Sequence, residues 1–199
     1  MTRLAFFASH NGSSAKAITQ ACAQGILEAE PVLLISNNAS CSAFIWAKDA
    51  GIKTYCLNEP GLGGTAPLDQ EIASVLKEHK IDLGICSGYM KLIGPQTIAT
   101  LKGKILNIHP ALLPKYGGKG MYGRKVHEAV KSAGDHVTGP TIHVVNEVYD
   151  DGDIIAQLEL PVRDSDTVKD IEERVKAAEP DFYIETLQKI LSGELTLPQ

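Results

Sequence analysis

The stretch that decides the fold is KILNIHPALLP, residues 104–114, in which an apolar run carries Asn107 and His109 and stops at Pro110. Side chains two positions apart on a strand point to the same face, so we expect the amide of Asn107 beside the imidazole of His109. Pro110 cannot donate a ladder hydrogen bond and favours an extended residue before it, so the strand should end at His109.

A polar pair at a strand end has two interpretations. In an open parallel sheet, ligands bind outside the carboxyl ends of the strands. An amide donor and an imidazole held together there suit a reaction that builds negative charge on an oxygen atom. The alternative is a strand end whose two polar groups are satisfied by hydrogen bonds within the protein. Spacing alone leaves both open.

Before residue 104, predicted strands alternate with helical patterns. Strands are expected at residues 3–8, 31–36, 53–57 and 82–86. Apolar residues spaced as on one helix face follow the first strand, from Ala15 to Ile26, and recur at residues 44–50, 68–79 and 96–101. Residues 58–67, with three glycines and two prolines, should be a loop. This alternation predicts an α/β fold: a Rossmann-like open, mostly parallel sheet with helices on both faces.

After residue 109 the pattern changes. Residues 115–123, KYGGKGMYG, contain four glycines and should form a flexible surface loop before a helix at 126–133. Strands at 141–148 and 153–162, joined by a turn at 150–152, should add antiparallel strands in the C-terminal half. Asp166 or Thr167 should cap a last helix, which Glu179-Pro180 would kink or restart. The chain reads as a single domain, residues 1–199.

Composition limits the classes of protein. The net charge of −5 and the scattered basic residues give no footprint for nucleic-acid binding. The four cysteines lie far apart without a C-x-x-C pair, which predicts free thiols and no zinc site. No apolar run approaches the roughly 20 residues of a membrane span. We therefore expect a cytoplasmic protein that acts on small molecules, with no membrane or nucleic-acid partner, as a monomer or homodimer.

Two further segments could bind a ligand. Residues 9–14, SHNGSS, lie between the first strand and helix, where Gly12 allows close approach and Ser13 or Ser14 could cap the helix or bind phosphate. A plain cap is the alternative, since neither the P-loop nor the Rossmann glycine pattern is present. Residues 87–95, SGYMKLIGP, either wall a flat ligand or pack on the core, and composition favours packing.

Together these motifs resemble the folate-dependent formyltransferases over nearly the whole chain. The pattern Asn-x-His-Pro-x-Leu-Leu-Pro followed later by an acidic turn is specific, whereas each remaining piece is weak alone. The matching segments are Asn11-Gly12-Ser13, Ser87-Gly88-Tyr89-Met90, Asn107-Ile108-His109-Pro110, Leu112-Leu113-Pro114, Thr138-Gly139, and residues 150–157 and 172–179.

The resemblance implies direct transfer of a formyl group from 10-formyltetrahydrofolate to the amine of glycinamide ribonucleotide, in de novo purine biosynthesis. Asn107 and His109 would stabilise the oxyanion of a tetrahedral intermediate. Asp150 would keep His109 cationic and relay protons from the amine to the leaving group. His143 matches a histidine near the site, although a structural role is the alternative. No metal and no covalent enzyme intermediate are implied.

The same resemblance divides the chain into residues 1–109, a nucleotide- and phosphate-binding half, and residues 110–199, a folate-binding and catalytic half. Gly12, Ser13 and Ser14 would bind the substrate phosphate, and Glu179 the ribose or amide portion. Five residues would form the folate loop, whose main-chain groups read the pterin edge: Tyr89, Met90, Lys91, Leu92 and Ile93. The remaining histidines, His10, His79, His127 and His136, are expected at the surface or in loops.

One departure bears on the acceptor. Many relatives have an arginine before the helix near Leu68 that pairs with the substrate phosphate, but residues 63–67 offer none. Basic residues around the glycine-rich loop, Lys119 and Arg124 among them, could compensate. The missing arginine keeps a second acceptor open, a different amine such as an amino sugar nucleotide. A folate- or nucleotide-binding module without turnover is disfavoured because binding alone does not require Asn107, His109 and Asp150.

Overall fold

Strand β5 (Ile105–His109) ends at His109, as predicted, and lies in a seven-stranded sheet. The computed structural model describes residues 1–198 and gives the strand order β3-β2-β1-β4-β5-β7-β8. The first five strands in this order, β3, β2, β1, β4 and β5, run parallel, which confirms the predicted α/β architecture. Their bounds are β1 (Thr2–Phe7), β2 (Ala29–Ser36), β3 (Lys53–Cys56) and β4 (Leu83–Cys86).

The C-terminal strands pair antiparallel, as predicted. β7 (Thr141–Val144) pairs with β5 on one side and with β8 (Ile154–Gln157) on the other. The strand predicted at 153–162 is not one strand, because the chain leaves the large sheet after β8. Its last part, β9 (Leu160–Pro161), pairs instead with β6 (Val137–Thr138).

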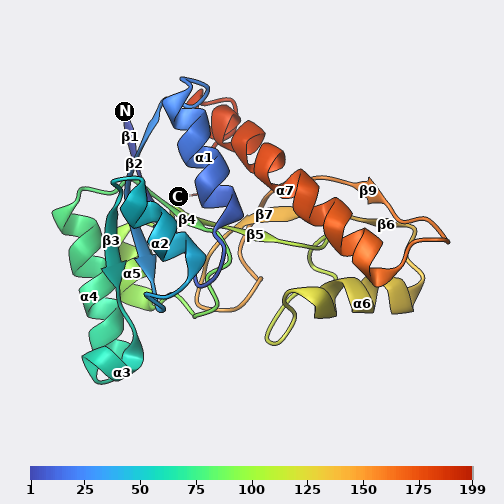
Figure 1. Ribbon diagram of the computed structural model, residues 1–199, viewed down its shortest axis with the longest axis horizontal. Coiled ribbons are helices and arrows are strands. Elements are labelled where there is room, and N and C mark those ends of the chain that lie inside the picture. The colour runs from blue at the N-terminus through green and yellow to red at the C-terminus, as the bar shows by residue number, and fades with distance from the viewer. Residues whose placement is uncertain (199) are drawn as a thin grey trace.

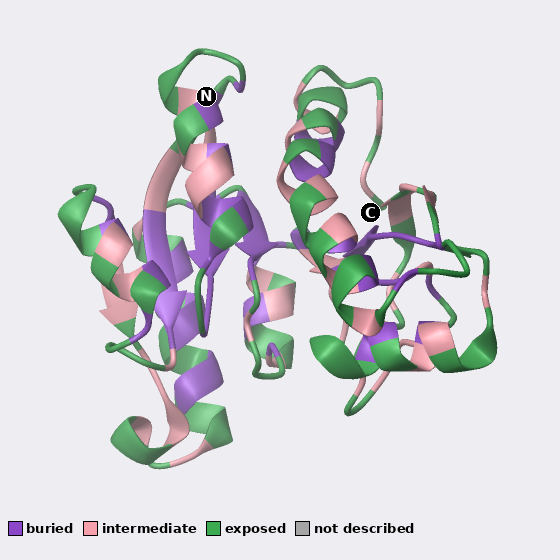
Figure 2. Ribbon diagram, turned by 45° about the vertical axis from the view of Figure 1, so that its right-hand side comes forward, coloured by how far each residue is buried: buried purple, intermediate pink, exposed green. Residues whose placement is uncertain are grey.

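Helices cover both faces of the sheet, so the parallel strands are buried on both sides (Figures 1 and 2). Residues alternate along β1: Leu4 and Phe6 enter one core cluster, and Ala5 and Phe7 enter the other. Helices packed on the first cluster are α1 (Ser13–Ala23), α2 (Ser42–Asp49) and α7 (Val168–Leu191). On the second lie α4 (Thr65–Glu78) and α5 (Pro95–Thr100).

Two local predictions were wrong. Residues 58–67 are not all loop, because α3 (Glu59–Leu62) forms there and α4 begins at Thr65. The Asn58 side chain accepts a hydrogen bond from Gly61 N (2.9 Å) and Pro60 occupies the first turn, which together favour a short helix. Ile26 does not lie on the buried face of α1, since that helix ends at Ala23 and the Ile26 side chain is 47% exposed.

The last helix begins at a capping box. Thr167 accepts a hydrogen bond from the amide of Asp170, whose carboxylate accepts one from Thr167 N, so Thr167 is the cap rather than Asp166. The helix continues through Pro180 and does not restart there, and α7 packs along α1 (Figure 1). Among residues 1–198, no helix combines the length and apolar character needed to cross a membrane.

Candidate active site

The site lies at the end of β5, where β7 pairs with it. Asn107 and His143 are opposite each other in the β5–β7 register, and Asn107 Nδ2 lies 3.0 Å from His143 Nε2. His109, whose side chain is only 4% exposed, has Nδ1 3.4 Å from Asp150 Oδ2. His143 Nε2 lies 3.6 Å from the other carboxylate oxygen. The four predicted side chains thus form one connected cluster.

The hydrogen bonds of the two histidines define which ring nitrogens carry protons. A carbonyl oxygen only accepts, so His143 Nδ1 donates to Val144 O (3.0 Å), and His109 Nε2 donates to Tyr116 O (2.8 Å). In neutral His143, Nε2 can then accept from the Asn107 amide. The Nδ1 of His109 is the nitrogen that faces Asp150. These contacts fix both ring orientations before any substrate binds.

Asp150 is held as an anion. Burial raises its pKa, but the adjacent His109 and His143 rings, the charge of His109 and the Gly118 amide outweigh that effect and hold the pKa well below its usual range. Gly118 N donates to Asp150 Oδ2 at 2.9 Å. A Cβ on Gly117 would lie 2.5 Å from Leu113 and 3.2 Å from the Asp150 side chain, so the close approach requires glycine there. The start of the predicted surface loop is therefore tied to the site.

Asp150 is also distinguished from its neighbours by geometry. The side chain of Asp150 is only 12% exposed, whereas Asp151 and Asp153 are exposed. The backbone of Asp150 adopts a left-handed conformation (φ 56°). Among residues 1–198, no group of three or more histidine, cysteine or acidic side chains is arranged to hold a metal ion. The acidic turn therefore contributes one carboxylate to the cluster.

The first βα turn uses glycine, not serine, as its helix cap. Gly12 precedes α1 with φ 62°, and a Cβ there would lie 2.8 Å from Ala43. The prediction that Ser13 or Ser14 caps the helix was wrong, since both lie inside α1 and Ser14 is buried. Gly12 has no side chain that could accept a hydrogen bond from the first amides of this helix.

Ser9 joins this turn to the segment at residues 87–95. Ser9 N donates to Gly88 O (3.0 Å), and Ser9 Oγ accepts from Met90 N (2.9 Å). Ala15 N also donates to the buried hydroxyl of Ser87 (3.1 Å). The two segments predicted to bind different substrates are therefore hydrogen-bonded to each other.

Residues 87–95 pack partly on the core, the interpretation that composition favours. Ile93 is buried in the core and Tyr89 packs on Phe7, with ring centroids 5.6 Å apart, whereas Met90 and Leu92 are exposed. The far end of the segment is held by buried Asp69, which accepts from the amides of Gln96 (2.8 Å) and Thr97 (2.9 Å). The segment is thus anchored at both ends and presents apolar side chains between them.

Glu179 lies on α7, the helix that packs along α1. Burial raises the pKa of its carboxyl group to about 7, against the opposing charge of Lys176. One turn earlier, Lys176 donates a hydrogen bond to Glu172, and this contact, with a smaller contribution from Arg124, lowers the pKa of Glu172. Helix α7 therefore carries a carboxyl group that changes protonation state near pH 7.

The histidine predictions were partly wrong. His10 and His136 are exposed as expected, and His79 ends α4 with Nε2 2.6 Å from the Tyr55 hydroxyl. His127, however, is buried on the apolar face of α6 (Arg124–Ala133), beside Val126 and Val130. Burial lowers its pKa. The amphipathic pattern of residues 126–133 could have revealed this, because position 127 falls between two inward residues.

Residues 2–187 match the formyl transferase family, and the chain belongs to that family. The matched residues include both the parallel strands and the antiparallel strands β7 and β8 of the large sheet. The fold is the Rossmann-like fold of solved formyltransferases: the phosphoribosylglycinamide formyltransferase from Bacillus halodurans superposes with a TM-score of 0.88 at 35% identity, covering 96% of each chain.

Two relatives carry the same name. The chain is 39% identical over 192 residues to the chloroplastic phosphoribosylglycinamide formyltransferase of Arabidopsis thaliana, covering 94% of this chain and 65% of that protein. It is 33% identical over 197 residues to the phosphoribosylglycinamide formyltransferase of Haemophilus influenzae, covering 99% and 91%. The chain therefore spans slightly less than two thirds of the plant relative and most of the bacterial one.

Proposed function

We propose that this protein transfers the formyl group of 10-formyltetrahydrofolate to the amine of glycinamide ribonucleotide. The observation that carries the proposal is the cluster of Asn107, His109, His143 and Asp150 at the end of β5, in a chain of the formyl transferase family. The names of its relatives supply the acceptor. The cluster supplies the chemistry, because it pairs hydrogen-bond donors with a carboxylate at one buried point.

In this reaction the amine nitrogen attacks the formyl carbon, and the carbonyl oxygen becomes an oxyanion. The Asn107 amide and His109 Nδ1–H donate to that oxygen, since the 3.4 Å contact of Nδ1 with Asp150 is long enough for a closer acceptor to compete. Asp150 stabilises the imidazolium form of His109. The same carboxylate accepts the proton that the attacking amine loses and returns it to the departing folate nitrogen.

The substrates would bind on either side of this cluster. The amides around Gly12, Ser13 and Ser14 bind the phosphate, and Glu179 binds the ribose or amide portion. The folate ring lies against residues 89–93, whose main-chain groups read its edge. We thus assign phosphate binding to residues 1–109, which also supply Asn107, His109 and the 89–93 loop, and the remaining folate-binding and catalytic groups to residues 110–199. The cytoplasmic location and the monomeric or homodimeric state stay predictions.

A first test concerns Glu179. Because its pKa is raised to about 7, the carboxyl group is neutral below that pH and ionised above it. An ionised carboxylate is the stronger acceptor for substrate hydroxyl and amide groups, so the KM for the amine substrate should rise as pH falls through 7. In Glu179→Gln, KM should lose this pH dependence and stay high. Glu185→Gln, an exposed position on the same helix, is the matched control and should keep the wild-type profile.

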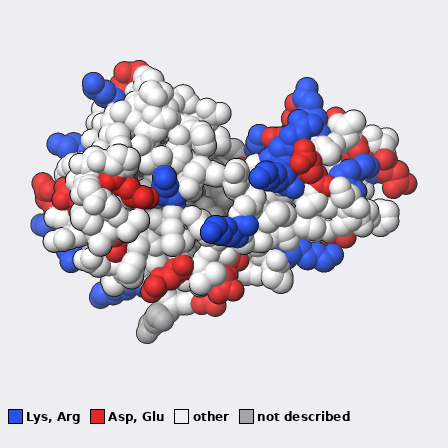
Figure 3. Space-filling view, turned by 90° about the horizontal axis from the view of Figure 1, so that it is seen from below, with Lys and Arg blue, Asp and Glu red and all other residues white. Residues whose placement is uncertain are grey.

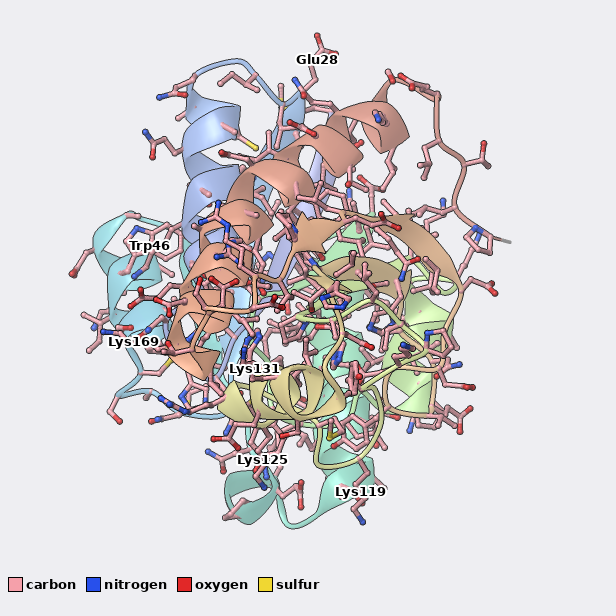
Figure 4. All side chains as sticks on the ribbon, turned by 90° about the vertical axis from the view of Figure 1, so that its right-hand side faces the viewer. Glu28, Trp46, Lys119, Lys125, Lys131 and Lys169 are labelled. Carbon is pink, nitrogen blue, oxygen red and sulfur yellow. The ribbon has the colours of Figure 1, made fainter. Side chains whose placement is uncertain are left out.

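A second test concerns the missing arginine. Figure 3 shows Lys and Arg side chains gathered on the side where Figure 1 places α6, separated by a hollow from the larger body. Arg124 is the first residue of α6, and its charge contributes to lowering the pKa of Glu172 on α7. Lys119 lies at the outer edge of the molecule in Figure 4. If these cations replace the arginine, Lys119→Ala with Arg124→Ala should raise the KM for the amine. An unchanged KM, equal to that of the exposed-site variant Lys48→Ala, would contradict this.

The acceptor itself is tested by direct assay. Supplied with a 10-formyl folate and glycinamide ribonucleotide, the protein should release deformylated folate, followed by absorbance. Binding of folate without turnover would favour the second candidate, an amine such as an amino sugar nucleotide, which the absence of arginine in residues 63–67 keeps open. Turnover with glycinamide ribonucleotide would exclude the reading as a binding module.

A further inference from the structure

We propose that Tyr116 and Asp135 are positioning residues for His109. The hydrogen bond between the Tyr116 hydroxyl and the Asp135 carboxylate holds Tyr116 in a left-handed backbone conformation, and this directs the Tyr116 carbonyl onto His109 Nε2. The inference rests on the proposed function, since it gives His109 a catalytic role. It adds two residues outside the cluster of Asn107, His109, His143 and Asp150.

The carbonyl of Tyr116 determines what His109 can do. Nε2 lies 2.8 Å from that oxygen, which can only accept, so Nε2 keeps its proton in both charge states of the ring. Nδ1, which faces Asp150, is consequently the nitrogen that gains and loses a proton. Without the carbonyl, a neutral ring could place its proton on either nitrogen or rotate. The contact therefore selects one tautomer and one ring orientation.

The backbone that presents this carbonyl is unusual. Tyr116 has φ 58°, a conformation that is unfavourable for a bulky aromatic residue because Cβ approaches the following carbonyl group. Among residues 1–198, four non-glycine residues have positive φ, and two of them, Tyr116 and Asp150, contact His109. Such conformations persist where the surrounding structure holds them.

The Tyr116 side chain supplies the restraint. Its hydroxyl donates to Asp135 Oδ2 at 2.9 Å, and its ring packs beside Val130, Val162 and Ile171. Hydrogen bonds from Tyr116 and Lys115 lower the pKa of Asp135, so the acceptor is a carboxylate at neutral pH. Lys115 Nζ is 3.2 Å from the same carboxylate but is mostly exposed, so the hydroxyl is the structured partner. The Tyr116 side chain is thus anchored by Asp135, which follows it by 19 residues in the sequence.

A double-mutant cycle with glycine separates this role from general stability. Glycine adopts positive φ without strain, so a chain with Tyr116→Gly needs no anchor to present the carbonyl. We expect Asp135→Ala to lower kcat about tenfold in the wild-type background, with KM for both substrates nearly unchanged. In the Tyr116→Gly background, the same substitution should change kcat by less than about twofold. Lys115→Ala, which leaves the hydroxyl–carboxylate bond intact, is the control and should match wild type.

A second measurement is independent of turnover. ¹⁵N NMR of the histidine rings should show Nε2 of His109 protonated in wild type and in Asp135→Asn, whose amide oxygen can still accept from Tyr116. Tyr116→Phe and Asp135→Ala should instead give mixed tautomers. Unchanged His109 signals in both of these variants, or an equal loss of kcat in the tyrosine and glycine backgrounds, would overturn the proposal. If no formyl transfer were found at all, the NMR result would still decide it.

Discussion

Replacing His109 with alanine should lower kcat for formyl transfer by about 10²–10³-fold, the usual cost of removing one oxyanion donor. The effect should fall on kcat rather than on KM, because the donor acts on a charge that exists only during the reaction. Absorbance of the released folate gives both constants, and equilibrium binding of a folate analogue checks that the variant still binds folate.

The matched control is His136→Ala. That imidazole is 83% exposed and lies outside the cluster, so its loss should leave kcat unchanged. Since His109 is buried, its replacement also leaves a cavity, and the thermal unfolding of both variants should be compared. A His109→Ala protein that is folded, binds folate and turns over at the wild-type rate would contradict the assignment of His109 as an oxyanion donor.

The second large effect is expected for Asp150→Asn. The substitution keeps the shape of the side chain but removes the charge that supports a cationic His109 and the base that accepts the amine proton. General-base catalysis typically contributes about 10²–10⁴-fold, so kcat should fall by about 10³-fold. Asp151→Asn, at the neighbouring exposed carboxylate, should retain wild-type kcat. Equal activity in the two variants would argue that the proton passes through another group.

Asp150→Asn should also change stability in a pH-dependent way. The folded-state pKa of Asp150 lies below its ordinary value of 3.8, so its contribution is fully present above that value and is lost as pH falls through the lower, folded-state pKa. The free energy of unfolding of the variant should therefore fall below that of wild type at neutral pH, and the difference should shrink in strong acid. Urea unfolding at several pH values measures it.

Much of this architecture was predictable because it depends on local sequence. Apolar runs separated by helical patterns gave the parallel strands, and a proline after His109 marked the end of β5. The pairing of an amide and an imidazole two residues apart follows from the period of a strand. The start of α7 is likewise determined locally, because the side chains of Thr167 and Asp170 form its capping box.

What remained unpredicted depends on contacts between distant segments. Ser9 looked like one polar residue in a turn, and only tertiary pairing shows that it binds Met90, 81 residues later. Asp69 lies on the buried face of α4, where an acidic residue indicates that a hydrogen-bond partner is present. The sequence does not show that these partners are the amides of Gln96 and Thr97 at the start of α5. The left-handed conformation of Tyr116 had no sequence signal either, since two glycines follow it and would be the expected sites of positive φ, whereas tyrosine adopts this conformation rarely.

Asn107 and His143 meet because the register of β5 and β7 places their side chains on the same face of the sheet. Inserting or deleting one residue inside either paired segment would turn every following side chain to the opposite face of the sheet. The pairing of β7 with β8 is already irregular beside His143, where one residue of β8 is skipped. We therefore expect that a single-residue insertion or deletion would be tolerated in the connecting turns or at that bulge, but would disrupt the site if it fell inside β5 or β7.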